Sequence, residues 1–214
     1  MRRRWMFIAI AFALILAMGA YVCFPQLRLW AHSKALQQVS AARWVDAHRY
    51  DPEWFDAARA GRVDILQALY DAHYPVDTQN ASGYTAVVLA AYDEQPEALN
   101  YLLSVGANAC IADHNGNTAL MGAIYKGHTT IARRLLQTSC PIDQANKAGE
   151  TALAFAVLFG RKSLLSELVR HGARLDSRDV NGQTPMAIAA KQGDNDMVQM
   201  LRGLGGYGLT GWPL

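Results

Sequence analysis

The sequence predicts an all-α solenoid of stacked helix-turn-helix units, and three observations predict it. A period of 33 residues runs through most of the chain, each period contains two apolar segments, and turn residues recur at fixed places. The period is marked by glycine and, two residues later, threonine: Gly83 and Thr85, Gly116 and Thr118, Gly149 and Thr151, and Gly182 and Thr184. A constant period of about 20–50 residues is typical of stacked repeats rather than of one closed globule.

Other positions repeat in step and define the extent of the repeats. Alanine recurs at Ala90, Ala123, Ala156 and Ala189, and leucine at Leu102, Leu135, Leu168 and Leu201. One period earlier, Ala57 and Leu69 mark a degenerate copy. We therefore expect one degenerate and four clear repeats within residues 51–206.

Each period has the pattern of two short helices. Leu135 and Leu136 lie in a segment with helical apolar spacing, and Asn115 with Gly116 favours a tight turn. The threonine before each first segment can cap free amide groups, and Pro185 suits a first helical turn. One unit cannot bury its apolar face alone, whereas stacked units can.

This pattern resembles the ankyrin repeat family, in which Gly-x-Thr-Pro-Leu-His-x-Ala-Ala is followed by Leu-Leu and Gly-Ala. Residues 83–91 read Gly-Tyr-Thr-Ala-Val-Val-Leu-Ala-Ala, and Leu102, Leu103, Gly106 and Ala107 follow. The resemblance implies an ankyrin solenoid that binds another protein, of the membrane-anchored or exported bacterial kind.

One departure from the family is uniform. The position of the family histidine holds Val88, Met121, Ala154 and Ala187. The hydrogen bonds that this histidine makes to neighbouring repeats are therefore expected to be absent, and the stack is expected to depend more on apolar packing.

The N-terminus carries a second signal, within residues 1–25. Arg2–Arg4 precede an uncharged run of twenty residues, Trp5–Phe24, which as a helix is long enough to span a membrane. A cleaved signal peptide, with a small-residue site at Ala17–Gly19, is the alternative. The run exceeds the usual signal core of about 7–15 residues, which favours an uncleaved anchor.

The arginines also predict the orientation. Under the positive-inside rule they stay in the cytoplasm, so the repeats lie outside it, on the periplasmic side of an inner membrane. A cleaved form would be periplasmic or secreted. Residues 26–50 are expected to form a helix that caps the first repeat, with interfacial lipid contact as the alternative, and residues 207–214 a loose or folded-back tail.

Charge argues against a nucleic-acid partner. The chain has 20 Lys and Arg and 18 Asp and Glu residues, and five of the basic residues precede position 35, where no acidic residue occurs. The remainder is slightly acidic, whereas nucleic-acid binding needs a basic face.

The three cysteines do not form a disulfide framework. Cys23 lies in the predicted anchor, and Cys110 and Cys140 occupy different positions in successive repeats. A disulfide between these two requires Cα atoms within about 7 Å. Their unequal positions favour free thiols, although free thiols are unusual outside the cytoplasm.

No catalytic motif is present, so neither enzymatic activity nor a cofactor is expected. Gly-x-Ser-x-Gly, a phosphate loop and His-Glu-x-x-His are all missing from the sequence. Cys110 and His114 could be two metal ligands, but no second pair stands at a suitable spacing, so no metal site is expected.

The candidate binding surface is the concave face, because family members contact partners through exposed residues of the first helix. Large apolar residues occupy these positions on successive repeats and are the expected partner-binding residues: Leu89, Tyr92, Tyr125, Phe155, Leu158 and Phe159. A contiguous apolar stripe suggests a protein partner. Alternatively, a terminal segment of the chain covers the stripe, or some of the rings pack inward.

The sequence thus predicts a membrane-tethered protein-binding module. Two narrower roles follow from the resemblance alone: an immunity protein that neutralises a secreted toxin such as a lipase, or an accessory to peroxide defence. An enzyme is the hypothesis from another class, and no set of residues supports it.

Overall fold

The computed structural model describes residues 47–209, and their side chains from 48 to 205. The chain divides into two units, residues 1–49 and 50–214, and the repeats lie in the second. The predicted anchor at 1–25, nearly all of the predicted cap at 26–50, and residues 210–214 lie outside the described residues. Within the described part, no helix is both long and apolar enough to cross a membrane.

The repeats form five successive helix pairs, as the period predicted. After the short 3-10 helix η1 (Ala47–Tyr50), the elements are α3 (Asp51–Ala60) and α4 (Val63–Asp71), α5 (Ala86–Tyr92) and α6 (Pro96–Ser104), α7 (Ala119–Lys126) and α8 (Thr129–Leu136), α9 (Ala152–Leu158) with η2 (Lys162–Leu164) and α10 (Leu165–Arg170), and α11 (Pro185–Gln192) and α12 (Asn195–Leu209). Residues 47–209 contain no strand.

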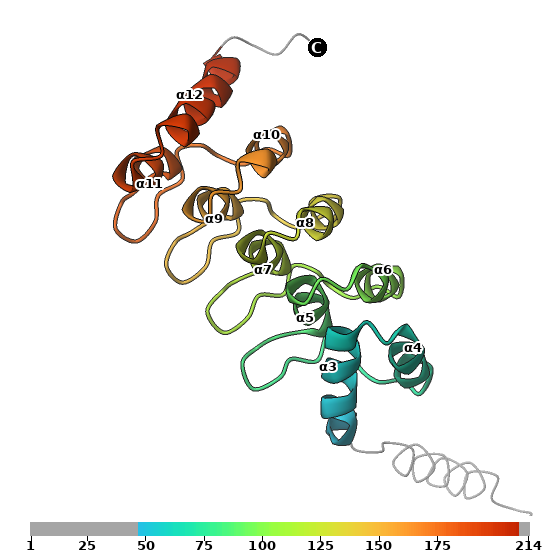
Figure 1. Cartoon of the computed structure of the whole chain (residues 1–214). Helices are drawn as coiled ribbons and strands as arrows, with labels where there is room; N and C mark the ends of the chain where they lie inside the picture. Colours follow the sequence, from blue (N-terminus) through green and yellow to red (C-terminus); the bar gives the residue numbers. More distant parts are fainter. Residues whose placement is uncertain (1–46, 210–214) are drawn as a thin grey trace, which may run out of the picture. The chain divides into compact units, whose positions relative to one another are not determined.

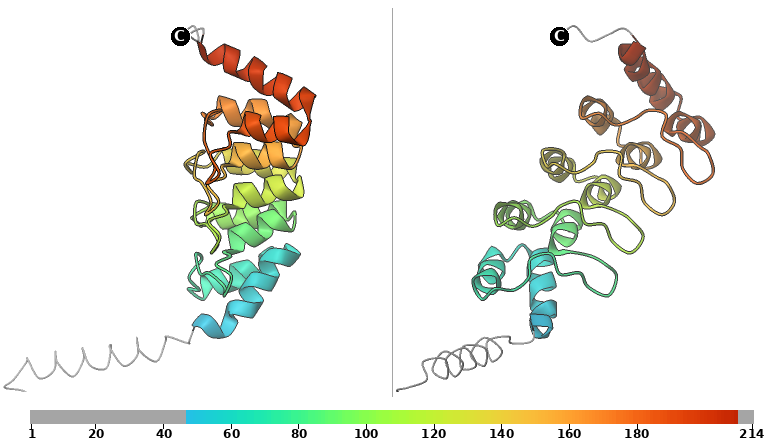
Figure 2. Two further views of the ribbon diagram at one scale, coloured as in Figure 1. Left: turned by 90° about the vertical axis from the view of Figure 1, so that its left-hand side faces the viewer. Right: turned by 180° about the vertical axis from the view of Figure 1, so that it is seen from behind.

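The helices form two rows. Figures 1 and 2 show the first helices α5, α7, α9 and α11 in one row and the second helices α6, α8 and α10 in another. The loops between repeats project from the first row, on the side away from the second. The first helices therefore line the surface beside the loops, where the sequence places the candidate residues.

Threonine begins four of the first helices, as predicted. Its γ-oxygen accepts a hydrogen bond of 3.2–3.3 Å from the backbone N–H three residues later, in Thr85, Thr118, Thr151 and Thr184. The donors belong to Val88, Met121, Ala154 and Ala187, the positions of the missing family histidine. Each cap satisfies an amide that the helix leaves free and contributes about 1 kcal/mol.

The first helices end in a left-handed residue, and the second repeat departs from the others there. Gly127 has φ 86° after α7, whereas Glu94 has φ 56° after α5. A side chain in this region costs about 1–2 kcal/mol. The carboxylate of Glu94 lies 3.3 Å from Nδ1 of His128 in the next repeat.

The core lies between the two helix rows. The recurring alanines Ala90, Ala123, Ala156 and Ala189 are fully buried, and their small side chains allow the helices to approach closely. Leu102 and Leu168 are also fully buried, and Leu135 is 4% exposed. The repeating apolar positions therefore form one continuous core along the stack.

The loops between repeats explain the recurring glycine. Each loop has Asn or Asp at its turn, and the side-chain oxygen accepts backbone N–H bonds from two and four residues later: Asn80, Asp113, Asn146 and Asp179. Neighbouring loops are joined by backbone hydrogen bonds. A Cβ on Gly149, where φ is 76°, would lie 2.8 Å from the backbone nitrogen of Val180 in the next loop, so the close stacking of the loops requires glycine.

The last helix is longer than the sequence suggested. The tail was expected to begin at 207, but α12 continues to Leu209. Its C-terminal part contains several glycines, each of which costs about 1 kcal/mol in a helix interior, and nothing in the structure explains why it continues.

Candidate protein-binding surface

Four rings form a connected aromatic row on the first helices: Tyr92, Tyr125, Phe159 and Phe155. The Tyr92 and Tyr125 rings are stacked with centroids 6.1 Å apart, and Tyr125 meets Phe159 edge-on at 4.8 Å. Phe155 and Phe159 lie 5.6 Å apart. The row therefore crosses three repeats without a break, and this contiguity agrees with the predicted stripe.

The row remains partly open to solvent. Tyr92 and Phe159 are each 37% exposed and Tyr125 is 43% exposed, while Phe155 is half-buried. The rings thus pack against one another and still present apolar surface, in contrast to the alternative that they simply point into the core.

The other two predicted residues lie differently. Leu89 is only 4% exposed, so its side chain is part of the core and not of the surface. Leu158 shares the helix position of Tyr92 and Tyr125 and is half-buried. The structure therefore places four of the six residues in mutual contact, one beside them, and one in the core.

Two residues of the third repeat, Gly122 and Lys126, lie against the Tyr92 ring of the second repeat. A Cβ on Gly122 would lie 3.6 Å from the Tyr92 ring, so this ring rests against the next helix. Lys126 Nζ lies 4.7 Å from the centroid of the same ring. A cation over an aromatic face contributes about 0.5–1 kcal/mol at an exposed site and restricts the ring.

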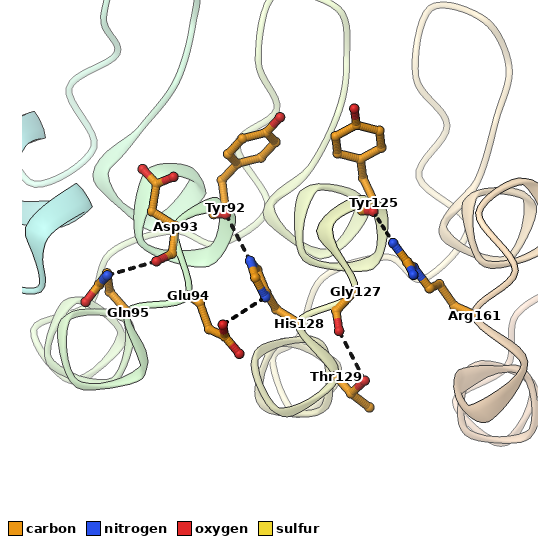
Figure 3. A network of polar contacts seen from close by, with 9 residues as sticks. All are labelled: Tyr92, Asp93, Glu94, Gln95, Tyr125, Gly127, His128, Thr129 and Arg161. Atoms are coloured by element: carbon orange, nitrogen blue, oxygen red, sulfur yellow. Dashed lines mark hydrogen bonds and ion pairs between the residues drawn. The ribbon is translucent and has the colours of Figure 1, made fainter.

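The backbone of the row is held by polar side chains of the following repeat. Arg161 donates from Nε to the carbonyl oxygen of Ile124 at 2.9 Å and from Nη2 to that of Tyr125 at 2.6 Å. His128 Nε2 lies 3.2 Å from the Tyr92 carbonyl oxygen, as Figure 3 shows together with the Arg161 contact.

The Leu158 carbonyl oxygen is held in a comparable way, because Gln192 Nε2 donates to it at 3.0 Å. These oxygens lie at the C-terminal ends of first helices, where carbonyl groups lack intrahelical partners. The positive charge of Arg161 also suits the negative end of the α7 dipole. Each contact fixes the helix turn that carries a residue of the surface.

These bonds change one expectation about the stack. The family histidine is missing as predicted, but cross-repeat hydrogen bonds are supplied from other positions, notably by Arg161 and Gln192. Polar contacts between repeats therefore accompany the apolar packing. A signal was present in the sequence, since His128 and Arg161 are one period apart and both follow a glycine.

The expectation of free thiols was wrong. Cys110 and Cys140 form a disulfide, with Cα atoms 5.2 Å apart. The two residues differ in repeat position, but the loops of neighbouring repeats stack closely enough to bring them together. Cys110 is thereby removed as a metal ligand, and the described residues hold no group of three or more potential ligands.

Comparison with known families agrees with the fold and the repeat positions. The model of the family described as "Ankyrin repeats (3 copies)" matches residues 54–146 and 138–207. The chain belongs to the ankyrin repeat family, a family of protein–protein interaction modules that are generally not enzymes. No curated protein matches the chain.

Proposed function

We propose that the aromatic row is the surface on which a second protein docks. The observation that carries this proposal is the connected set of partly exposed rings on three consecutive repeats. Large aromatic residues at the centre of an interface usually supply most of its binding energy. The row also has little conformational freedom to lose, because neighbouring rings and the contacts of Arg161 and His128 restrict it.

We further propose that the repeats act outside the cytoplasm, tethered by residues 1–25. Two features support this location. Arg2–Arg4 precede an uncharged run of membrane-spanning length, and the Cys110–Cys140 disulfide is of a kind that persists in oxidising compartments and is rare in the cytosol.

Capture of a partner by the anchored full-length protein tests the docking surface. Tyr125→Ala and Phe159→Ala should each weaken capture by more than about 1 kcal/mol, or roughly fivefold, if these rings are hot spots. Tyr70→Ala is the matched control, because Tyr70 is 38% exposed but lies on α4, outside the row. If Tyr125→Ala and Phe159→Ala capture the partner as strongly as Tyr70→Ala does, the proposal is contradicted.

The identity of the captured protein separates the narrower roles. A secreted toxin such as a lipase would indicate an immunity protein, and a peroxide-degrading enzyme would indicate an accessory in peroxide defence. A partner of a third kind would exclude both narrower roles but would not contradict the proposed docking surface.

A reporter that is active only outside the cytoplasm, fused after Leu214, tests the location. We expect activity, with the fusion retained in the membrane fraction after a carbonate wash. A silent reporter that is nevertheless expressed would contradict the orientation. An active reporter on a shortened, soluble protein would show cleavage of the N-terminal segment in place of anchoring.

A further inference from the structure

Neighbouring loops are joined at their bases by one recurring hydrogen bond. Asp77 Oδ1 accepts from the backbone N–H of Asn108 at 2.8 Å, and Asp143 Oδ1 accepts from that of Arg174 at 3.0 Å. In both cases the donor follows the acceptor by 31 residues. The first bond joins the segments that follow the helix pairs of the first and second repeats, and the other joins those that follow the third and fourth.

The junction between the second and third repeats lacks both partners of this bond. The acceptor position holds Cys110, and the donor position holds Pro141, which has no backbone N–H. The disulfide from Cys110 reaches the residue just before that proline, Cys140. A covalent bridge therefore stands where the flanking junctions have a hydrogen bond.

The backbone beside the bridge is also less tightly bonded than its equivalents. In the first, second and fourth repeats the residue at the position of Cys140 donates a 3.0 Å backbone bond into the preceding helix, from Tyr74 to Leu69, Ala107 to Leu102, and Ala173 to Leu168. Within the described residues Cys140 makes no such bond to Leu135, whose carbonyl oxygen instead accepts from Thr138 N at 3.0 Å and Thr138 Oγ1 at 2.6 Å.

The bridge lies within reach of a reductant. Both cysteines are half-buried and not in the core. A cavity of about 130 Å³ lies beside Cys140, with Thr138, Pro141 and His171 also among its lining residues. A small dithiol or an exposed thiol of an oxidoreductase can therefore approach the sulfur of Cys140.

We propose that the Cys110–Cys140 disulfide is a redox-controlled staple of the junction between the second and third repeats. The reductant is a dithiol of the thioredoxin class. One of its thiolates attacks a sulfur of the bridge, so that the S–S bond breaks, a mixed disulfide forms and the other cysteine leaves as a thiolate. The second thiol of the reductant then attacks the reductant's sulfur in the mixed disulfide and displaces the remaining cysteine. Two electrons and two protons pass to the protein, Cys110 and Cys140 become thiols, and the dithiol becomes a disulfide.

Reduction leaves the base of this junction without the bond that its neighbours have between the equivalent positions. Position 110 then has no carboxylate and position 141 still has no N–H, so no hydrogen bond replaces the bridge. The loops remain joined by side-chain bonds, from Gln144 Nε2 to the Cys110 carbonyl oxygen at 3.2 Å and from Asn146 Nδ2 to Asn117 Oδ1 at 3.0 Å. They also remain joined by one backbone bond, from Lys147 N to the Asn115 carbonyl oxygen at 2.8 Å. We expect that bond to open more often once the base of the loop is released.

The same junction is crossed by the aromatic row. Tyr92 lies on the second repeat and Tyr125 on the third, and their rings are stacked. An effect of reduction on partner binding would follow from this contact and rests on the proposed function. The staple itself does not depend on that function and is tested without a partner.

Hydrogen exchange of three equivalent amides on the full-length protein tests the staple. Lys147 donates to Asn115 across the stapled junction, whereas His114 donates to Ser82 and Val180 to Ala148 across the hydrogen-bonded junctions. With dithiothreitol, exchange at Lys147 should rise by about tenfold or more, because local opening governs exchange. Exchange at His114 and Val180 should stay within about twofold.

Two sets of substitutions complete the test. Cys110→Ala with Cys140→Ala should exchange rapidly at Lys147 with or without dithiothreitol. The triple variant Cys110→Asp, Cys140→Ala and Pro141→Asn introduces the hydrogen-bond acceptor and donor that the flanking junctions have. Exchange at Lys147 should be slow again in this variant, and dithiothreitol should no longer affect it. This rescue separates loss of the staple from general damage to the fold.

Several results would overturn the proposal. One is unchanged exchange at Lys147 when thiol titration shows Cys110 and Cys140 to be reduced. Another is equal acceleration at all three amides, which would mean global destabilisation. Failure of the Asp and Asn substitutions to slow exchange would show that the bridge does not stand in for the hydrogen bond.

Discussion

The middle and the ends of the first-helix row differ at one surface position. In the middle repeats this position holds Tyr92, Tyr125 and Leu158, whereas one period before and after them it holds Arg59 and Lys191, both exposed. The period gives all five the same place on their helices, so only the side chain varies. The fold therefore determines where this position lies on the surface. The residue that occupies it makes the surface apolar in the middle repeats and charged in the first and last repeats.

The largest expected difference between middle and end concerns stability. Leu168 is fully buried, and Leu168→Ala should lower the free energy of unfolding by about 2–5 kcal/mol, through lost burial and a cavity. The equivalent Leu69 in the degenerate first repeat is only half-buried, so Leu69→Ala should cost less. Urea unfolding of both variants measures the difference, and an equal or larger loss for Leu69→Ala would show that the end repeat is as tightly packed as the middle.

A smaller effect is expected from the contacts that hold the row. Arg161→Met removes the charged donor to the Ile124 and Tyr125 carbonyl groups and should cost about 1.5 kcal/mol. Arg133→Met is the matched control, because Arg133 forms an exposed pair with Glu167 at 2.9 Å on the second helices, and such a pair contributes about 0–1 kcal/mol. Equal losses in urea unfolding would mean that Arg161 is only another surface cation.

The smallest effect is expected at a loop, where Asn and Asp have the same role. Hydrogen bonds from the backbone of Gln183 and Asn181 lower the pKa of Asp179. Because its folded pKa is depressed, its contribution to stability is present above its unfolded pKa and is lost as the pH falls through the folded value. Asn146 accepts the equivalent bonds without a charge.

Asp179→Asn should therefore change stability at pH 7 very little and should reduce the loss of stability in acid. Thermal unfolding of the full-length protein between neutral pH and about pH 3 measures both effects, and an NMR titration of the Asp179 carboxyl group checks the direction of its pKa. A titration midpoint above the usual Asp value of about 3.9 would contradict the account.

Much of this fold follows from the period, because each repeated position has one environment. The threonine caps, the glycine turns, the buried Leu168 and the meeting of Tyr92 with Tyr125 could all be predicted by placing equivalent residues side by side. Residues at non-equivalent positions could not be paired in this way. Cys110 and Cys140 meet only because of the stagger between stacked loops, which the spacing of the sequence does not show.

The sequence also predicted the site incompletely, because the burial of a side chain depends on the neighbouring repeats. Leu89 and Tyr92 are one helical turn apart on the same face, yet Leu89 is buried and Tyr92 is partly exposed. The hydrogen bond from Arg161 to the Tyr125 carbonyl oxygen likewise depends on the distance between the two repeats. The sequence of a single repeat does not give that distance.

The most direct test of the account is to ask which ring touches the partner. A photo-crosslinking phenylalanine analogue in place of Tyr125, in the anchored full-length protein, should form a covalent adduct with the captured protein on irradiation. The same analogue in place of Tyr70, which is similarly exposed at 38% against 43%, should form none. An adduct from position 70 without one from position 125 would contradict the claim that the aromatic row is the binding surface.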